Sequence, residues 1–472
     1  MNSSRLRQTL GLAYVATALA QLAEVAFVFL LYHQFAASEV GLFSWAGAWF
    51  AFAYVVADFG LEPLMVRRTA SQPVGLQRMV QAVFALRLPL LLLGACLLAI
   101  LWMLRVIDEQ QALFLLLLCT QIIFNIADTS QRAWLRANGR QTTANALLSG
   151  LSILKLMVML VCGLWLQLGL VAVLVALLLM RLPYSIVHRA IGAACPARKD
   201  VQNETVSILV RWQLRVGTPL VAMGLLTTLQ NRLDWLLVAR FVSVDALAVY
   251  SLANKAYEIA QVVIGVATTT MYPILCTLSP RSAASKMTVL KLVVLTGLFM
   301  GVGGTITLPP TVHLIFGDKY EGIDLPLQIM MLAVGFMAAA GVLYSLALSQ
   351  GLERKILIVS VLASTLQAVS NLWMIRHWGI AGASTSMVVL VLAMASGLLY
   401  LCIKADLVST KDAWRLGLTL TVYALTCSML IFFQLTGTAL GLVVAVLMMA
   451  AAPALLLLPE EWRRLKQVDR PE

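Results

Sequence analysis

Long apolar stretches, separated by short polar ones, follow one another along almost the whole chain. About 14 of them reach the roughly 20 residues that cross a bilayer as an α-helix. They cover residues 9–33, 40–62, 76–104, 111–133, 143–166, 169–188, 216–241, 245–278, 286–316, 325–350, 356–375, 380–404, 414–435 and 437–458. None shows the period-two alternation of a membrane β-strand. The pattern predicts an all-α, polytopic membrane protein with about 14 transmembrane helices.

Composition agrees with a membrane protein and excludes an ordinary soluble domain. Of the 472 residues, 61% are hydrophobic and 12% are charged, whereas soluble domains are about half apolar and about a quarter charged. The first stretch begins like a signal peptide, but it carries Glu24 and continues to Tyr32, so we expect it to be the first spanning helix. The seven cysteines avoid the loops predicted to lie outside, so no disulfide framework is expected.

The net charge of +12 comes from basic residues that gather in alternate loops, before the first stretch and after each even-numbered one. The remaining loops contain only Arg105, Arg240, Lys319 and Arg376. Cationic loops stay in the cytoplasm. Both termini are therefore predicted to be cytoplasmic. The excess charge is explained by topology, and no nucleic-acid partner is expected.

Short motifs recur in the two parts of the chain at offsets of about 204 to 213 residues. For example, "GLFSWA" from Gly41 corresponds to "AVYSLA" from Ala248, and "LRANGRQ" from Leu135 to "LSQGLERK" from Leu348. Stretches one to six then correspond to seven to twelve in the same orientation. The predicted units are an N-terminal lobe, 1–205, a C-terminal lobe, 206–405, and an additional region, 406–472, with two helices and a cytoplasmic tail. Parallel repeats occur in transporters whose substrate site lies near the membrane midplane.

The order of these motifs resembles the MOP (MATE/polysaccharide transporter) superfamily. The motifs are "EVGLFSWAGAWF", "DALAVYSLANKAYEI", "NRLDWLLVARF" and the Gly-Arg and Glu-Arg dipeptides after the fourth and tenth stretches. Within this superfamily the chain looks most like the polysaccharide branch, the Wzx-type flippases, over about residues 5–405. The resemblance implies two six-helix lobes that form a V around a central cavity, which opens alternately to each side.

This resemblance implies a flippase that moves undecaprenyl-diphosphate-linked oligosaccharide across the bacterial inner membrane by alternating access, for O-antigen, capsule or exopolysaccharide assembly. It implies no enzymatic activity and no cofactor, with H⁺ or Na⁺ as possible coupling ions. Membrane lipids, a polysaccharide polymerase and a chain-length regulator are candidate partners.

Charged residues well inside the stretches are few and fall in the first eight. Such residues face a cavity or pair with one another. An anionic diphosphate requires cationic partners, and Arg87 stands near the middle of its stretch without a neighbour of opposite charge. The candidate substrate-binding residues are Arg87, Arg132, Gln230, Arg232, Asp234, Lys255 and Glu258, and the coupling-ion candidates are Glu24 and Asp58.

Static ion pairs are the alternative for these residues. The spacing of Asp128 and Arg132, and that of Lys255 and Glu258, predicts pairs within one helix. Arg87 would instead pair with a carboxylate of another helix. The four histidines have no metal-binding spacing, so no metal site is expected.

Three other functions compete with the flippase. A multidrug or cation antiporter would require an acidic cavity, which Arg87, Arg232 and Lys255 disfavour. A lipid II flippase would favour arginines around the first, second and eighth stretches, and the first has none inside the membrane. A membrane glycosyltransferase or polymerase usually requires a large outer loop, and the outer loops here are short.

Overall fold

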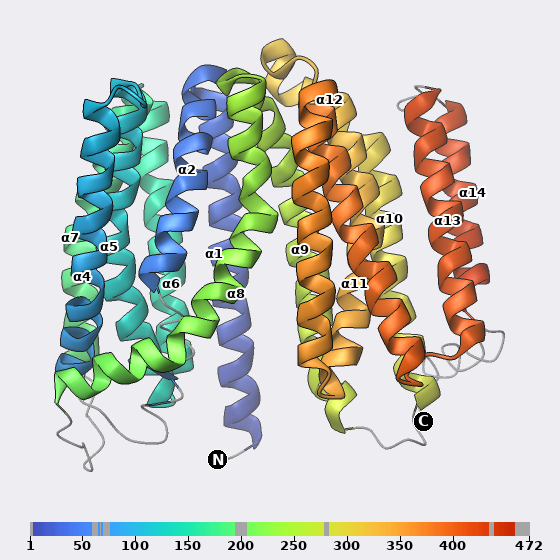
Figure 1. Cartoon of the computed structure of the whole chain (residues 1–472), viewed down its shortest axis with the longest axis horizontal. Coiled ribbons are helices and arrows are strands. Elements are labelled where there is room, and N and C mark those ends of the chain that lie inside the picture. Colours follow the sequence, from blue (N-terminus) through green and yellow to red (C-terminus); the bar gives the residue numbers. More distant parts are fainter. Residues whose placement is uncertain are drawn as a thin grey trace. The chain divides into compact units, whose positions relative to one another are not determined.

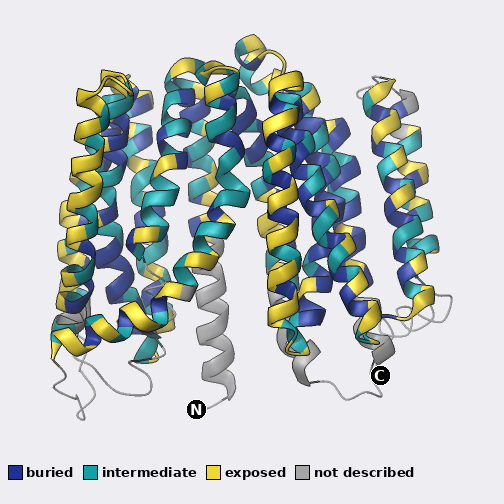
Figure 2. Ribbon diagram, in the orientation of Figure 1, coloured by how far each residue is buried: buried dark blue, intermediate teal, exposed yellow. Residues whose placement is uncertain are grey.

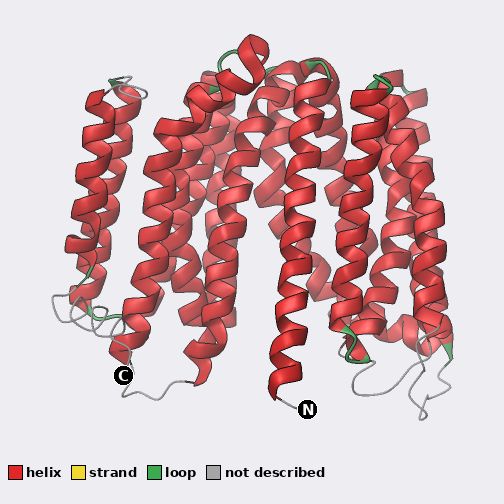
Figure 3. Ribbon diagram, turned by 180° about the vertical axis from the view of Figure 1, so that it is seen from behind, coloured by secondary structure: helices red, strands yellow, loops and turns green. Residues whose placement is uncertain are grey.

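The chain is an assembly of long helices joined by short connections (Figures 1 and 3). The computed structural model describes residues 3–58, 65–66, 68, 76–193, 205–277, 283–433 and 439–457, and these residues contain no strand. The all-α prediction is confirmed. Most of the two long basic loops, 67–78 and 191–204, and the tail beyond 457 lie outside the described residues.

The described part of every predicted apolar stretch lies on helices, and nine described helices are long and apolar enough to cross a membrane. The elements are α1 (Ser3–Gln34), α2 (Ala37–Asp58), α4 (Leu76–Met103), α5 (Glu109–Ala137), α6 (Gln141–Val158), the π-helix η1 (Met159–Trp165), α7 (Leu170–Ala193), α8 (Val206–Phe241), α9 (Val244–Thr277), α10 (Ala283–Phe316), the 3₁₀-helix η3 (Gly317–Tyr320), α11 (Asp324–Ser349), α12 (Glu353–Lys404), α13 (Thr410–Phe432) and α14 (Ala439–Leu456).

The predicted stretches 356–375 and 380–404 are continuous in the structure, as the two parts of α12. The chain changes direction between them at Gly379, whose φ of 56° and ψ of −134° are not helical. Only glycine adopts such angles readily, because it has no Cβ. One non-helical residue, Gly379, therefore separates the two predicted stretches within α12.

Helix α8 begins at Val206, well before the predicted start at residue 216. Its first part buries Leu209 and Gln213, while Arg211 and Arg215 are exposed. A two-sided helix of this kind has a lower average hydropathy than a spanning segment. Apolar length alone therefore missed it.

The chain forms two compact units, Met1–Arg232 and Leu233–Glu472, and the boundary falls inside α8. The first part of α8 packs with unit 1, where Leu209 joins a core that includes Ala82 and Ile126. The predicted lobes, 1–205 and 206–405, were defined by the repeat rather than by packing, and their boundaries stay a prediction.

Each unit is organised around one central helix. In unit 1, α5 packs against α2, α4, α6 and α7; in unit 2, α11 packs against α9, α10, α12 and α13. Of the most apolar window of α11, 78% is buried, the largest share among the nine candidate spans (Figure 2). Helices α5 and α11 correspond to one another in the predicted repeat, so equivalent segments occupy equivalent packing positions.

The ends of α5 and α11 repeat one another in detail. Gly139 and Gly351 follow these helices with φ values of 76° and 73°. The amide of Arg140 donates to the carbonyl of Leu135 at 2.9 Å, and the amide of Leu352 donates to that of Ala347 at 3.3 Å. Both are six-to-one bonds of a Schellman cap, which requires a left-handed residue. The two similar sequence motifs therefore form the same helix-capping structure.

Helix α13 lies outside the repeat but is part of the core of unit 2. Its Tyr423 is fully buried, and the hydroxyl donates to the carbonyl of Met331 on α11 at 2.9 Å. A Cβ at Gly301 would lie 2.0 Å from this hydroxyl oxygen. Lys291 of α10 and Asp412 of α13 form an ion pair at 2.6 Å. Glycine at 301 thus permits α13 to dock closely.

Candidate functional site

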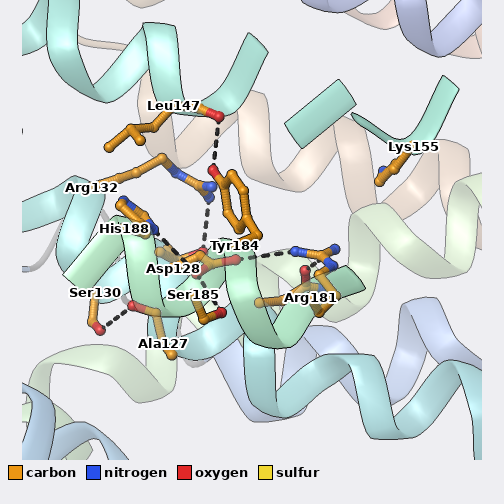
Figure 4. A network of polar contacts seen from close by, with 12 residues as sticks. Ala127, Asp128, Ser130, Arg132, Leu147, Lys155, Arg181, Tyr184, Ser185 and His188 are labelled. Atoms are coloured by element: carbon orange, nitrogen blue, oxygen red, sulfur yellow. Dashed lines mark hydrogen bonds and ion pairs between the residues drawn. The ribbon is translucent and has the colours of Figure 1, made fainter. Parts of the chain in front are cut away.

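A buried polar network joins α5 and α7 within unit 1 (Figure 4). The carboxylate of Asp128 on α5 accepts bonds from Arg181 Nη1 at 3.1 Å, Ser185 Oγ at 3.2 Å and His188 Nδ1 at 3.1 Å, all from α7. Arg181 also donates to Asn125 Oδ1 at 2.7 Å. The three donors recur at helical spacing on one face of α7, and they occupy both carboxylate oxygens.

The predicted pair of Asp128 with Arg132 is wrong. Arg132, one turn further along α5, donates to Thr129 Oγ1 at 3.0 Å. Spacing along a helix makes a contact possible, but the donors of α7 approach Asp128 directly and satisfy its oxygens. Arg132 is part-buried, and no carboxylate of the described residues is within ion-pair distance of it.

Sequence reasoning did not identify the α7 side of this network. Arg181 was noticed as a charge, but Ser185 and His188 were not connected with it. The available signal was their spacing of four and three residues, which places all three on one face of an apolar helix.

Arg87 is held inside unit 1 by neutral acceptors, and its side chain is 1% exposed. Its guanidinium donates to the main-chain carbonyl of Asp58 at 2.6 Å, to Gln213 Oε1 at 3.1 Å and to the carbonyl of Val83 at 3.3 Å. It therefore connects the end of α2 with α8. These hydrogen bonds give Arg87 a structural role, and its role in substrate binding stays a prediction.

Glu24 of α1 and Lys155 of α6 form an ion pair at 3.1 Å within unit 1. Glu24 lies about 15 Å from the end of α1 at Gln34, well inside a hydrocarbon layer about 30 Å thick. The side chains are nevertheless 42% and 24% exposed. Charges at such depth face water or a polar partner rather than lipid tails.

Unit 2 contains a comparable pair. The predicted contact between Lys255 and Glu258 on α9 is confirmed at 2.7 Å, and the side chains are 26% and 30% exposed. Lys255 also lies 5.8 Å from the ring centroid of Trp235 on α8, within cation–π range. Lys255 lies about 16 Å from the start of α9 at Val244. Among the described residues, each unit thus carries a part-exposed ion pair at depth.

The polar residues of α8 fall into two groups. Asp234 is 1% exposed and accepts bonds from the Tyr250 hydroxyl of α9 and from the amide of Trp235. Gln230 and Arg232 are part-buried. Asp234 therefore connects α8 with α9, and the role of these three residues in substrate binding stays a prediction.

Unit 2 also has an apolar groove of about 400 Å³, formed by α11, α12 and α13. Its lining includes Phe336, Leu343, Leu392, Leu399, Leu416 and Leu420. The sequence did not reveal it, because these residues resemble lipid-facing ones and come from three helices. No cluster of potential metal ligands occurs in the described part of the chain.

Residues 12–279 match the sequence family described as Polysaccharide biosynthesis protein. No curated protein matches the chain. Among solved structures, "Lipid II flippase MurJ, inward closed conformation" has a TM-score of 0.72 at 12% identity, and the match covers 96% of this chain and 99% of that one. A multidrug resistance MATE family transporter of the MOP superfamily, in an inward-facing conformation, has a TM-score of 0.64 at 14% identity, over 83% and 95% of the two chains.

These structural similarities show that the protein has the fold of the MOP-superfamily transporters. The chain belongs to the polysaccharide biosynthesis protein family, because the family match covers more than half of its length. The polysaccharide family that the sequence motifs indicated is confirmed by the family match, and the fold is that of the MOP-superfamily transporters.

Proposed function

We propose that the protein is a flippase that moves a lipid-linked oligosaccharide across the bacterial inner membrane by alternating access. The observation that carries this proposal is the combination of part-exposed ion pairs at membrane depth with a separate apolar groove. A substrate with a polar head and a long hydrocarbon tail requires both kinds of surface. Membership of the polysaccharide biosynthesis family supports a glycan as the head.

The ion pairs supply the polar surface. Glu24 with Lys155, and Lys255 with Glu258, stay part-exposed where lipid tails would exclude them. The hydroxyls of a sugar can accept hydrogen bonds from the lysines and donate them to the glutamates, and ammonium groups attract a diphosphate. Arg132 is part-buried and bonded to a hydroxyl rather than a carboxylate, so its charge is available to a phosphate.

The groove supplies the apolar surface. A polyprenyl tail in the membrane is already out of water, so the groove gains no hydrophobic free energy relative to lipid and holds the tail by close packing. Leu416 and Leu420 of α13 form one wall, and Leu392 and Leu399 of α12 form another. We assign this groove to the polyprenyl tail.

Two alternative functions, a lipid II flippase and a multidrug or cation antiporter, differ from this proposal in the substrate they would transport. A lipid II flippase would share the groove, and the two proposals differ only in the sugar moiety that is transported. A multidrug or cation antiporter would not require the groove, and its cationic substrate would be repelled by Arg132, which is bonded to a hydroxyl and not to a carboxylate. Glu24 and Asp58 remain proposed carriers of a coupling ion, to be tested as Glu24→Gln and Asp58→Asn in vesicles with and without imposed gradients.

Filling the groove tests the proposal. Gly417 lines it, and a Cβ there would meet nothing within 4 Å, so Gly417→Leu adds bulk to the groove without a clash. Gly94→Leu on α4 is the matched control, since Gly94 is also unobstructed and exposed. Transport into vesicles is measured with a lipid-linked oligosaccharide, with lipid II and with a cationic dye.

We expect Gly417→Leu to reduce transport of the lipid-linked oligosaccharide several-fold at normal membrane abundance, while Gly94→Leu leaves it unchanged. Transport of the dye alone by the unaltered protein would replace this proposal with the antiporter. Faster transport of lipid II than of the oligosaccharide would replace it with the lipid II flippase.

A further inference from the structure

His188 is the one histidine of the chain that is fully buried, and it lies on the last turns of α7. Its Nδ1 is 3.1 Å from Asp128 Oδ1. Its Nε2 is also buried and makes no hydrogen bond to any described residue. A buried polar atom without a partner is uncommon in proteins, and it points to a ligand or a function.

The contacts of Asp128 determine which nitrogen of His188 carries hydrogen. The carboxylate accepts from Arg181, whose guanidinium is permanently charged, and from the hydroxyl of Ser185. An ionised carboxylate has no hydrogen to donate, so Nδ1 must donate to it. Nε2 then carries the free lone pair, and in the neutral ring this lone pair is a base.

We propose that Asp128 and His188 form a proton-binding site within unit 1, with His188 Nε2 as the atom that binds the proton. Hydronium transfers a proton to the Nε2 lone pair: one of its O–H bonds breaks, an N–H bond forms, water is released, and the ring becomes an imidazolium held by Asp128. Imidazole changes charge between about pH 5 and pH 8.

The groups around Asp128 and His188 favour a proton over a metal cation at this site. Both oxygens of Asp128 are already occupied by donors from Arg181, Ser185 and His188. Metal cations of the hard class prefer oxygen ligands, whereas the remaining acceptor is a nitrogen. As a coupling ion for the proposed flippase, a role that depends on the proposed function, this site selects H⁺ over Na⁺.

The charges around the site determine what proton binding does. Arg181 and Asp128 neutralise one another, so the proton leaves a net positive charge. The other groups near the ring are Tyr184, whose ring centroid lies 5.7 Å away, and the cation of Arg132 on α5. On α6, Lys155 is paired with Glu24. An unbalanced charge on a fully buried group is costly, so proton binding requires water or an anion to approach the end of α7.

Nitrogen NMR of isotope-labelled histidine tests the site without any transport substrate. The chain has four histidines, and replacing His33, His313 and His377 by glutamine leaves the signals of His188 alone. In a second assignment, spectra of the protein with all four histidines are compared with those of His188→Gln, and the signals that disappear belong to His188. Spectra are recorded in lipid nanodiscs from about pH 8 to about pH 5, the range in which imidazole changes charge.

We expect a ring with hydrogen on Nδ1 at the upper end and hydrogen on both nitrogens at the lower end. Asp128→Asn should reduce the doubly protonated fraction at each pH, because it removes the charge that holds the imidazolium. Ser185→Ala is the matched control, since it removes an uncharged contact with the same oxygen and should have a much smaller effect. A ring that stays neutral throughout, or that carries its hydrogen on Nε2 at the upper end, overturns the proposal.

A transport measurement then separates the site from the proposed function. We expect His188→Gln, which keeps a donor to Asp128 but binds no proton, to lose the part of transport that depends on a proton gradient. Unaltered gradient dependence in His188→Gln would overturn the coupling role, even where the ring titrates. Failure of the unaltered protein to move lipid-linked oligosaccharide would contradict the proposed function and leave the proton site standing.

Discussion

Arg181 Nη1 and Asp128 Oδ2 lie 3.1 Å apart across two helices, and their side chains are 4% and 1% exposed. The pair is buried inside unit 1, where neither charge can be solvated if the other is removed. Breaking a buried pair costs about 3–5 kcal/mol, because it leaves one charge uncompensated, whereas replacing both charges by apolar groups is often neutral.

Arg181→Ala should therefore destabilise the protein by about 3–5 kcal/mol, while Arg132→Ala should cost about 1 kcal/mol or less, since it removes one hydrogen bond. The combined variant Arg181→Met with Asp128→Leu should recover most of the loss. Thermal unfolding in detergent and abundance in the membrane measure this order. A larger loss from Arg132→Ala than from Arg181→Ala would contradict the pairing.

Arg87 and Lys255 should respond differently to truncation. Arg87→Ala removes the donors to the Asp58 carbonyl and to Gln213, and each unsatisfied buried acceptor costs about 1–3 kcal/mol. Lys255 is part-exposed, and pairs of this kind contribute about 0–1 kcal/mol.

We therefore expect low membrane abundance for Arg87→Ala, partial recovery in Arg87→Lys, and normal abundance with slower transport for Lys255→Ala. Abundance on immunoblots and surface polysaccharide are measured on the same cells. Normal abundance of Arg87→Ala together with abolished transport would instead give Arg87 a direct role in substrate binding.

Gly379 should tolerate no side chain. Its φ of 56° and ψ of −134° lie outside the regions open to other residues, and such backbone strain costs about 1–3 kcal/mol. Gly94→Ala is the matched comparison, because Gly94 is helical and unobstructed, and alanine there favours the helix by about 1 kcal/mol. Thermal unfolding should rank Gly379→Ala below the unaltered protein and Gly94→Ala at or above it. Equal stability of the two variants would mean that the break in α12 is not fixed by this residue.

The distribution of basic loops predicts which side of the membrane each helix end occupies. Ala37, at the start of α2, and Tyr320, at the end of η3, should lie outside; Ala283, at the start of α10, should lie in the cytoplasm, as should Pro196, which is outside the described residues. Single cysteines on a cysteine-free background are labelled with a reagent that does not cross the membrane. Labelling of Ala37→Cys only from the cytoplasmic side would reverse the topology.

The sequence by itself determined where the apolar helices are, although not the amphipathic start of α8. Apolar length is a local property, because every spanning segment must satisfy its backbone bonds as a helix. The repeated motifs at Gly139 and Gly351 were also readable, since a left-handed residue after a helix strongly favours glycine. The contact of Lys255 with Glu258 followed in the same way, from neighbours on one helix face.

Only the tertiary structure decided which charges meet between helices. Arg181 and Asp128 are 53 residues apart in the chain, and Lys155 and Glu24 are 131 residues apart. Such contacts depend on how each helix is rotated about its axis and which neighbours it packs against. The spacing of residues along one helix gives neither the rotation nor the neighbours. It therefore led to the wrong prediction that Asp128 pairs with Arg132, whereas α7 supplies donors for both oxygens of that carboxylate.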